Sequence, residues 1–340
     1  MTHRSIIPIC MLLLTGVMGT DGIAQPRAPE VIRARAQLAK QKYEAQRSRQ
    51  QVRPSPDQRF YGKAAAPVDS YRKIPKRIRR QLEPRVQRIL KYLSRTGQRG
   101  PATFDGDGTL WGGDVGEGFF RWMLGKRHYP AERIPMLRRA WTGYRTGTLP
   151  GEKMYELMVT SMAGMQESEV KQLAERYFDT VHRHRIYRPS SNLIQALSRM
   201  GIEPWVISGS PRWVVAAGAR HIGIPAHHVI GLGVKVDRQG RLTGEVVRPV
   251  PWQHGKAKRI IRDVGQTPLL AAGNSYGDIQ MLKTASELSL VINPGPRVLH
   301  HARTLGWTIH RYTRRDEFAR SIRLLPPPSS PQSAPDQPPP

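Results

Sequence analysis

The stretch of sequence that decides the fold reads FDGDGTLW and runs from Phe104 to Trp111. Ala102–Phe104 predicts a short strand, and Asp105 and Asp107 follow it in a glycine-rich turn. In an open α/β sheet, ligands bind beyond the carboxyl ends of the strands. A carboxylate at that place can hold a divalent cation or attack phosphorus, and a second one can serve as general acid and base. This turn is therefore the first candidate for the site of chemistry.

A calcium-binding loop or a plain turn would also place two aspartates close together. An EF-hand loop that starts at Asp105 needs glycine at position 110 and glutamate at position 116, whereas the sequence has Leu110 and Gly116. The EF-hand is therefore excluded. An Asp-Gly turn without further function stays open when this stretch is taken alone.

Strand-like and helix-like segments alternate after this turn. Apolar runs predict buried strands at 204–207, 269–272 and 288–292. Residues 229–247 predict a hairpin with its turn at 237–240, and residues 116–200, which lack any strand-like run, predict four or five helices. Strands separated by helices indicate an α/β fold with a mostly parallel sheet covered on both faces. The helical block is then an inserted second domain.

Polar residues follow the later strands as well. Ser208 and Gly209 end the second predicted strand, where a hydroxyl and a flexible backbone suit a phosphoryl oxygen, although serines there are commonly helix caps. Lys256 opens a predicted helix and can neutralise a phosphoryl group, or it is a solvated surface lysine. Asn274 and Asp278 follow the third apolar run, and their oxygen side chains suit a hard cation such as Mg²⁺.

The order of these four motifs resembles the haloacid dehalogenase superfamily, and specifically its phosphatases, over about residues 100–312. The hairpin and the segment 291–294 look like the phosphoserine-phosphatase-like branch. This resemblance implies a Rossmann-like core with an inserted helical cap of the C1 type. It assigns the core to residues 81–115 and 190–325 and the cap to residues 116–189.

The resemblance also implies a role for each motif. Asp105 is the nucleophile, which forms an aspartyl phosphate, and Asp107 is the acid and base. The residues expected to bind the phosphoryl group are Thr109, Ser208, Gly209 and Lys256. The expected Mg²⁺ ligands are Asp105, the Asp107 carbonyl, Asn274 and Asp278. Asn274 departs from the aspartate that many relatives carry, so an oxygen ligand is kept and a charge is lost.

The sequence says least about the substrate. Asp114 lies where phosphoserine-phosphatase relatives carry an acidic residue that faces the substrate ammonium group. Trp111, Trp141 and Tyr144 are aromatic residues near or within the cap that can line a cationic pocket. We therefore expect a small cationic phosphomonoester such as phosphoserine, phosphoethanolamine or phosphocholine. The alternative is that the tryptophans are packing residues and Asp114 caps the helix that follows it.

Charge is concentrated near the N-terminus. The chain has a net charge of +28, and residues 25–100 carry 21 Lys/Arg against 5 Asp/Glu. We expect a basic, disordered or solvated-helical arm at 25–80 that can bind an anionic polymer or membrane surface. An alternative function is therefore binding to such a surface, with the α/β fold as a scaffold.

The two ends of the chain indicate export and disorder. Residues 1–24 predict a signal peptide, so we expect a periplasmic or secreted protein without a transmembrane segment in its mature form. Cys10, the only cysteine, lies in that peptide, which excludes a disulfide scaffold and a thiol nucleophile from the mature chain. Residues 326–340 are proline-rich and predict a disordered tail.

Overall fold

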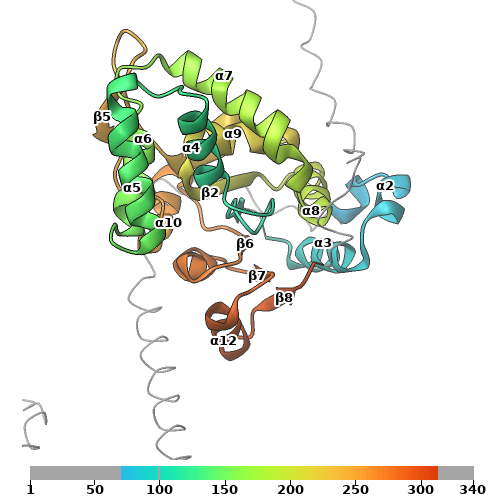
Figure 1. Ribbon diagram of the computed structural model, residues 1–340. Coiled ribbons are helices and arrows are strands. Elements are labelled where there is room, and N and C mark those ends of the chain that lie inside the picture. Colours follow the sequence, from blue (N-terminus) through green and yellow to red (C-terminus); the bar gives the residue numbers. More distant parts are fainter. Residues whose placement is uncertain (1–69, 99, 313–340) are drawn as a thin grey trace, which may run out of the picture. The chain divides into compact units, whose positions relative to one another are not determined.

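The computed structural model describes residues 70–98 and 100–312, and its centre is a six-stranded parallel sheet (Figure 1). The strand order is β3-β2-β1-β6-β7-β8. The strands are β1 (Ala102–Phe104), β2 (Pro204–Pro211), β3 (Val229–Leu232), β6 (Leu270–Gly273), β7 (Leu288–Ile292) and β8 (Thr308–His310). The predicted α/β fold is confirmed. The expected signal peptide, the outer part of the arm and the proline-rich tail lie outside the described residues.

β1 lies in the middle of the sheet, between β2 and β6. Phe104 pairs with Val206 on one side and with Ala272 on the other. Because the three strands are parallel, their carboxyl ends meet at one edge of the sheet. The register therefore brings the turn after β1 next to the ends of the two strands that carry the other motifs.

The sheet is buried on both faces. Every residue of β1 and β6 is buried, without the alternation of a strand that faces water. Ala272 packs in a core cluster with residues of α8 (Arg188–Arg199), whereas its neighbour Ala271 packs in a second cluster with residues of α12 (Pro296–Thr304). Successive side chains of a strand point to opposite faces, so helices cover both faces of the sheet.

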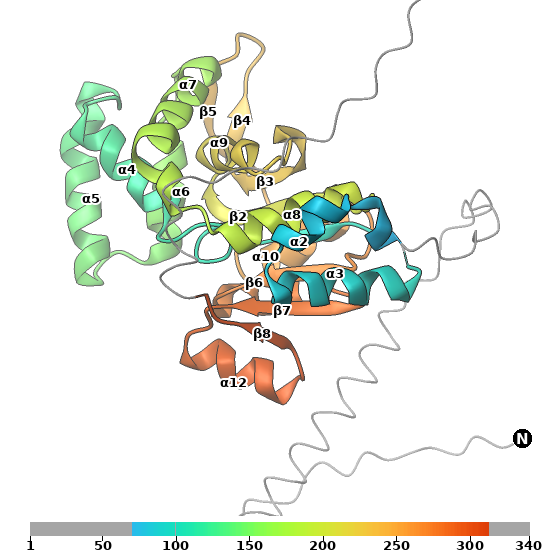
Figure 2. The same ribbon diagram turned by 90° about the vertical axis from the view of Figure 1, so that its right-hand side faces the viewer.

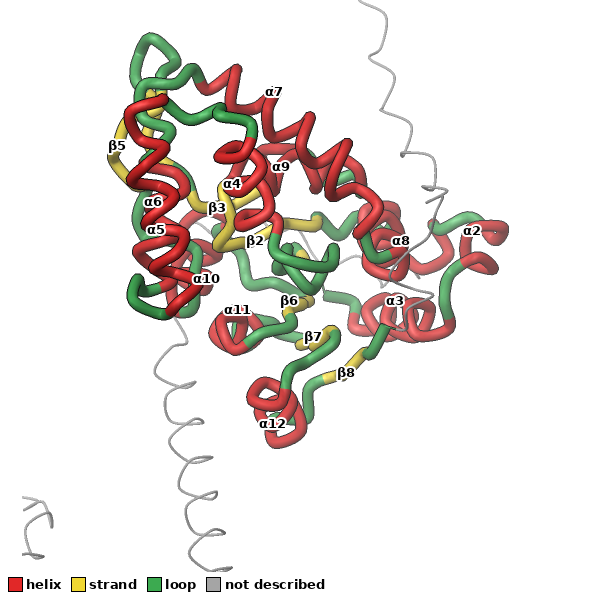
Figure 3. The backbone as a smooth tube through the Cα atoms, viewed as in Figure 1, coloured by secondary structure: helices red, strands yellow, loops and turns green. Residues whose placement is uncertain are grey.

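A block of helices separates β1 from β2 (Figures 1 and 3). These helices are α4 (Val115–Gly125), α5 (Ile134–Thr146), α6 (Gly151–Thr160), α7 (Glu167–Tyr177) and α8. As predicted, no named strand occurs between residues 116 and 200, all of which the structure describes. A hairpin of β4 (Val234–Val236) and β5 (Leu242–Val246) lies beside these helices (Figure 2). The Leu242 N–H donates to the Met165 carbonyl at 2.9 Å, which ties the hairpin to the helical block.

Within the described residues, two α-helices precede the central strand, α2 (Lys76–Gln81) and α3 (Pro84–Thr96). The α3 helix packs on α8, and its apolar residues are buried: Val86, Ile89, Leu90 and Leu93. The basic arm predicted over residues 25–80, however, extends too far along the chain. Tyr71, Ile74 and Ile78 are buried in the same core, so the described chain is packed from Ser70 onward.

Two further predictions need correction. The hairpin expected over 229–247 is wrong in its first part, because β3 pairs in parallel with β2 at an edge of the main sheet. The antiparallel hairpin is limited to β4 and β5. The sequence analysis also missed β8, which pairs with β7 at the other edge. The remaining helices are α9 (Arg212–His221), α10 (His254–Arg259) and α11 (Ile279–Leu282).

The described residues all fall within one compact unit of the chain. The expected boundaries between the core (81–115 and 190–325) and the cap (116–189) therefore stay predictions. Among the described helices, none has both the length and the apolar composition that crossing a membrane requires.

Candidate active site

A cavity of about 250 Å³ lies at the carboxyl ends of β1, β2 and β6. Its lining residues are Asp105, Asp107, Asp114, Glu152, Tyr155, Ser208, Gly209, Ser210, Val250, Trp252, Lys256, Asn274, Ser275, Gly277 and Asp278. The structure therefore brings together every residue predicted for catalysis, metal binding or phosphoryl binding, and Asp114, with the exception of Thr109 beside Asp105. The Thr109 hydroxyl donates to Asp105 Oδ2 at 3.3 Å.

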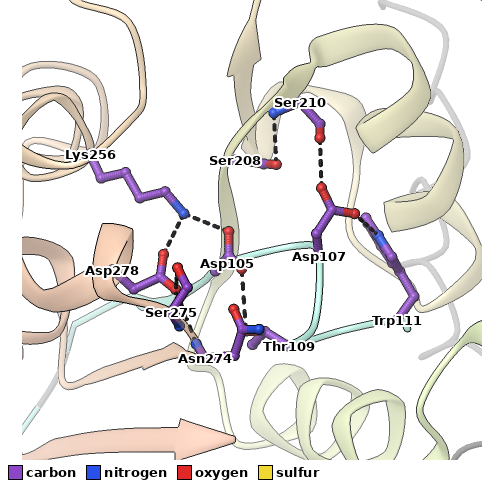
Figure 4. Close-up of polar contacts among 10 residues, drawn as sticks. All are labelled: Asp105, Asp107, Thr109, Trp111, Ser208, Ser210, Lys256, Asn274, Ser275 and Asp278. Atoms are coloured by element: carbon purple, nitrogen blue, oxygen red, sulfur yellow. Dashed lines mark hydrogen bonds and ion pairs between the residues drawn. The ribbon is translucent and has the colours of Figure 1, made fainter. Parts of the chain in front are cut away.

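Asp105 is fixed at the end of the central strand. Its N–H donates to the Ala272 carbonyl at 2.8 Å, which continues the pairing of β1 with β6. Its Oδ1 accepts a hydrogen bond from Lys256 Nζ at 2.5 Å (Figure 4). Burial and the nearby carboxylate of Asp278 raise the pKa of Asp105 to about 7, and Lys256 limits the rise. The sheet thus holds a buried carboxylate against a buried cation.

Lys256 lies between two carboxylates. Its Nζ also donates to Asp278 Oδ1 at 2.6 Å, and the lysine is 3% exposed. Burial alone would lower the pKa of Lys256, but Asp105 and Asp278 outweigh it, so the pKa is raised. The lysine is therefore charged, and the solvated-lysine alternative does not hold. Two of its three N–H groups are bonded to carboxylates, which leaves a third for a ligand oxygen.

Asp278 is tied to the turn after β6. Its Oδ2 accepts hydrogen bonds from the N–H groups of Asn274 and Ser275, at 3.0 and 2.9 Å, and from the Ser275 hydroxyl at 2.9 Å. Since Oδ1 accepts from Lys256, both carboxylate oxygens already have partners. In the structure, Asp278 orients Lys256 and the turn after β6. Its expected role as a metal ligand stays a prediction.

Asp107 is held by neutral donors instead of a cation. Oδ1 accepts from the Trp111 Nε1–H at 2.7 Å and from the Val115 N–H at 2.8 Å. Oδ2 accepts from the Ser210 hydroxyl at 2.6 Å (Figure 4). Desolvation and the carboxylates of Asp114 and Asp105 raise the pKa of Asp107 well above its ordinary value. The hydrogen bonds from Ser210 and Val115 lower the pKa but do not outweigh this rise. This environment favours a protonated carboxyl group, as a general acid requires.

The serines at the end of β2 are not helix caps. β2 continues through both of them to Pro211, and Pro211 precedes α9 without any side-chain cap. Ser208 is 1% exposed, and its hydroxyl accepts the Ser210 N–H at 3.1 Å. The contact of Ser210 with Asp107 was not predicted, because it depends on the pairing of β1 with β2.

Asp114 caps a helix, as the alternative expects, and it also lines the cavity, so its expected contact with a substrate ammonium group stays a prediction. Its Oδ1 caps α4 by accepting the Glu117 N–H at 2.7 Å, and its Oδ2 accepts the Tyr155 hydroxyl at 3.2 Å while it lines the cavity. Burial raises the pKa of Asp114. Tyr155, Glu152 and Trp252 also line the cavity and were not predicted, since none of them belongs to one of the four motifs.

The other aromatic residues expected at the substrate are packing residues. Trp111 is fully buried, and its ring meets Phe178 edge-on at 5.4 Å. The rings of Trp141 and Tyr144 pack on each other with their centres 5.6 Å apart, and neither residue lines the cavity. The expectation that these three residues form a cationic pocket is therefore wrong, and the packing alternative is right for the two tryptophans.

Asn274 reaches the turn after β1 because residue 108 is glycine. Gly108 has φ +76°, and a Cβ built there would lie 1.9 Å from Asn274 Nδ2. Any larger residue would displace the amide from the cavity. The glycine of the motif therefore makes room for the side chain that follows β6.

The residues present fit Mg²⁺. Asp105 and Asn274 offer oxygen atoms at one end of the cavity, and Mg²⁺ commonly binds one or two carboxylates together with waters or substrate phosphate. Within residues 70–98 and 100–312, no group of three or more His, Cys, Asp or Glu side chains could hold a metal ion. Asp105 and Asp278 share a single lysine, so a cation would balance negative charge that the lysine leaves uncompensated.

Comparisons with known proteins agree with this geometry. A family model described as haloacid dehalogenase-like hydrolase matches residues 102–283. Phosphoserine phosphatase SerB1 of Mycobacterium tuberculosis (strain ATCC 25618 / H37Rv) is 27% identical over 151 residues, which are 44% of this chain and 49% of that protein. A hydrolase of Mycobacterium leprae (strain TN) is 26% identical over 159 residues, 46% of this chain and 53% of its own length. The chain thus spans about half the length of the curated relatives it matches.

A solved structure shows the same fold. The crystal structure of a protein of unknown function from Bordetella pertussis Tohama I has a TM-score of 0.53 and 22% sequence identity. It covers 62% of this chain and 98% of its own.

Proposed function

Because the chain belongs to the haloacid dehalogenase-like hydrolase family, we propose that it is a Mg²⁺-dependent phosphomonoesterase. The family expected from the motif order is the family that matches, and the similarity to a phosphoserine phosphatase agrees with the expected branch. The observation that carries the proposal is the contact of Asp105 with Lys256 at the end of the central strand. A buried carboxylate next to a fixed cation is what attack on an anionic phosphoryl group requires.

In the first half of the proposed reaction, an Asp105 oxygen attacks phosphorus and the bond to the leaving oxygen breaks. Lys256 and Ser208 hold the phosphoryl oxygens, and the backbone N–H of Gly209 contributes at the same end of the cavity. Asp107 gives its proton to the leaving oxygen. The products of this half are an alcohol and an aspartyl phosphate.

In the second half, water attacks the phosphorus of the aspartyl phosphate. Asp107, now ionised, takes the proton from the water as the bond between phosphorus and Asp105 breaks. Inorganic phosphate leaves and Asp107 is protonated again. Mg²⁺, held by Asp105, the Asp107 carbonyl and Asn274, would supply positive charge to the phosphoryl group throughout.

We infer a small cationic substrate from the other end of the cavity. Asp114 and Glu152 are acidic, and the tyrosine and tryptophan beside them, Tyr155 and Trp252, offer aromatic faces. A leaving group with an ammonium or quaternary amine meets complementary charge and rings there. Phosphoserine, phosphoethanolamine and phosphocholine are therefore the substrates to test first.

Hydrolysis of p-nitrophenyl phosphate with and without Mg²⁺, by the wild type and Asp105→Asn, tests the function. The wild type should need Mg²⁺, and the variant should lose at least about a thousandfold in rate because the nucleophile is gone. The asparagine keeps the shape of the side chain, so thermal unfolding checks that the fold is intact. Full activity of a folded Asp105→Asn would rule out the proposed nucleophile.

A second candidate function rests on a basic face. Residues 70–98 contain one acidic residue, Glu83, which contacts Arg188 and Asn192. Eight basic residues of this segment are exposed: Arg72, Lys73, Lys76, Arg77, Arg80, Arg88, Lys91 and Arg95. We propose that this face, with the expected arm before it, lets an exported protein adsorb to an anionic polymer.

Binding to heparin at increasing salt tests this second function. Removal of residues 25–69 should leave turnover of small phosphates nearly unchanged and weaken salt-sensitive retention. Retention that is unchanged would show that those residues are a solvated linker. Cell fractionation of the full-length chain tests the proposed export separately.

A further inference from the structure

A second cavity, of about 570 Å³ and widely open to solvent, adjoins the candidate active site. Glu152, Val250 and Trp252 line both cavities. Trp252 has the largest side chain of the three, so its indole is the main wall between the two spaces. On its far side the second cavity is lined by the exposed basic residues Arg248 and Lys258.

Trp252 is held in this position by its own loop. Its N–H donates to the Val250 carbonyl at 2.8 Å, and its carbonyl accepts the Gly255 N–H at 2.8 Å. A Cβ built on Gly255 would lie 1.8 Å from the Val250 oxygen, so the tight loop requires glycine. Gln253 has φ +48° and ψ −119°, a conformation that side chains rarely adopt and that persists only where the surroundings enforce it.

The indole also contacts both sides of the active-site cavity. Its ring meets that of Tyr155 on α6 edge-on, with the ring centres 6.2 Å apart. On the opposite side its Nε1 lies 3.5 Å from where a Cβ on Gly277 would be. Trp252 therefore spans from the inserted helices to the turn after β6, and it forms part of the cavity wall across that span.

We infer that Trp252 limits the size of the leaving group, and that the second cavity is space for a larger leaving group that the indole shuts off. This inference rests on the proposed phosphomonoesterase function and deepens it. The 250 Å³ cavity must hold the phosphoryl group as well as the leaving group, which leaves room for a short chain such as ethanolamine. Removal of the indole joins the two cavities and admits a bulky leaving group such as a naphthyl ring.

The test compares kcat/KM for phosphoethanolamine and 1-naphthyl phosphate in the full-length wild type, Trp252→Ala and Trp252→Phe. Relative to wild type, Trp252→Ala should raise kcat/KM for the naphthyl ester itself by about tenfold or more, the scale on which pocket size discriminates. A ratio that shifts only because phosphoethanolamine is turned over less well would reflect a lost aromatic contact and would overturn the inference. Trp252→Phe, which keeps a ring, should raise kcat/KM for the naphthyl ester much less. Trp122→Ala is the matched control, because Trp122 packs on Phe119 in the inserted helices and lines neither cavity.

Inhibition by inorganic phosphate gives a second readout. Phosphate binds at the Lys256 and Ser208 end, so its inhibition constant should stay within about twofold in Trp252→Ala. A larger change would show that Trp252 shapes the phosphoryl site and would overturn the inference. So would an unchanged ester ratio in folded Trp252→Ala, or in Trp252→Leu if the alanine variant unfolds. An inactive wild type on both esters would instead refute the proposed phosphomonoesterase.

Discussion

The two ends of the active-site cavity stabilise buried carboxylates in different ways: the core end, formed by Asp105, Lys256 and Asp278, and the cap end, formed by Asp114 and Tyr155. At the core end, Asp105 and Asp278 share the ammonium group of Lys256, at 2.5 and 2.6 Å. At the cap end, Asp114 accepts only neutral donors, the Glu117 N–H and the Tyr155 hydroxyl. Paired charge holds ionised groups in place, whereas neutral donors leave a carboxyl group free to be protonated or to attract a cation.

Asp107 lies between these two ends and resembles the cap end. Its three partners, Trp111, Val115 and Ser210, are all neutral, although Asp105 is only two residues away. The local surroundings thus separate two carboxylates that the sequence presents as equivalent. This difference matches the roles of nucleophile and acid in the proposed reaction.

Replacement of Lys256 should have the largest effect. Lys256→Met leaves Asp105 and Asp278 buried without their cation, which should lower the free energy of unfolding by about 3–5 kcal/mol and abolish turnover. Urea unfolding measures the first effect. Lys258→Met, at an exposed position of the same helix, should change stability by no more than about 0.5 kcal/mol. Equal losses in the two variants would contradict the paired-charge account.

The second-largest effect is expected when Asp107 is replaced by a residue that cannot donate the proton. Asp107→Asn should lower kcat/KM for phosphoethanolamine by about 10²–10⁴-fold, the usual contribution of a general acid. The loss for p-nitrophenyl phosphate should be much smaller, because its leaving group departs without protonation. If both substrates lost equally, Asp107 would be a structural residue of the turn and not the acid.

A smaller effect is expected at the cap end. Asp114→Asn keeps an N-cap for α4, since asparagine caps as well as aspartate. Loss of an ammonium contact of about 1–2 kcal/mol should lower kcat/KM for phosphocholine roughly five- to thirtyfold. The value for a sugar phosphate should barely change. Similar losses on both would mean that Asp114 shapes the cap and does not contact the leaving group.

The smallest effect concerns a buried histidine behind the cap end. His182 is 3% exposed in the turn Phe178–His182 after α7, and burial together with the charge of Arg185 lowers its pKa to about 4. The unfolded chain, with a histidine pKa near 6.5, therefore binds more protons between pH 6.5 and 4. Stability contributed by neutral His182 is full above pH 6.5 and is lost as the pH falls toward 4.

Urea unfolding from pH 7 to pH 4 tests this expectation. His182→Gln should reduce the acid-dependent loss of stability by about 1 kcal/mol, and His300→Gln, at an exposed position, should not. The same pH dependence in wild type and His182→Gln would show that another group controls acid stability.

The sequence predicted those parts of the fold whose signal is local. β6 and β7 are continuous apolar runs because both faces of the sheet are covered. β8 has three half-buried residues at a sheet edge, which leaves no such run. β3 is separated from β4 by Gly233 alone, so its pairing with β2 is invisible without the tertiary structure.

The same division applies to the site. Asp105, Ser208 and Lys256 were predicted because each lies in a short motif at a strand end or helix start. Trp252 and Tyr155 were not, because their place in the cavity depends on a strained loop and on the packing of α6. At residues 71–78 the burial of Tyr71 and the two isoleucines was obscured by the dense basic residues among them.

The order of the strands also decides when an active site can exist during synthesis. β1 pairs with β2 and β6 within the described sheet, and both of these follow it along the chain. The strand that positions Asp105 therefore waits without a partner until β2 ends at Pro211, and it lacks its second partner until Gly273 has been made. Helices α4–α7 can form during that interval, because helix formation is local and fast. Closing the long loops to β2 and β6 is the slow part of folding, so a chain that ends before β6 cannot assemble the site.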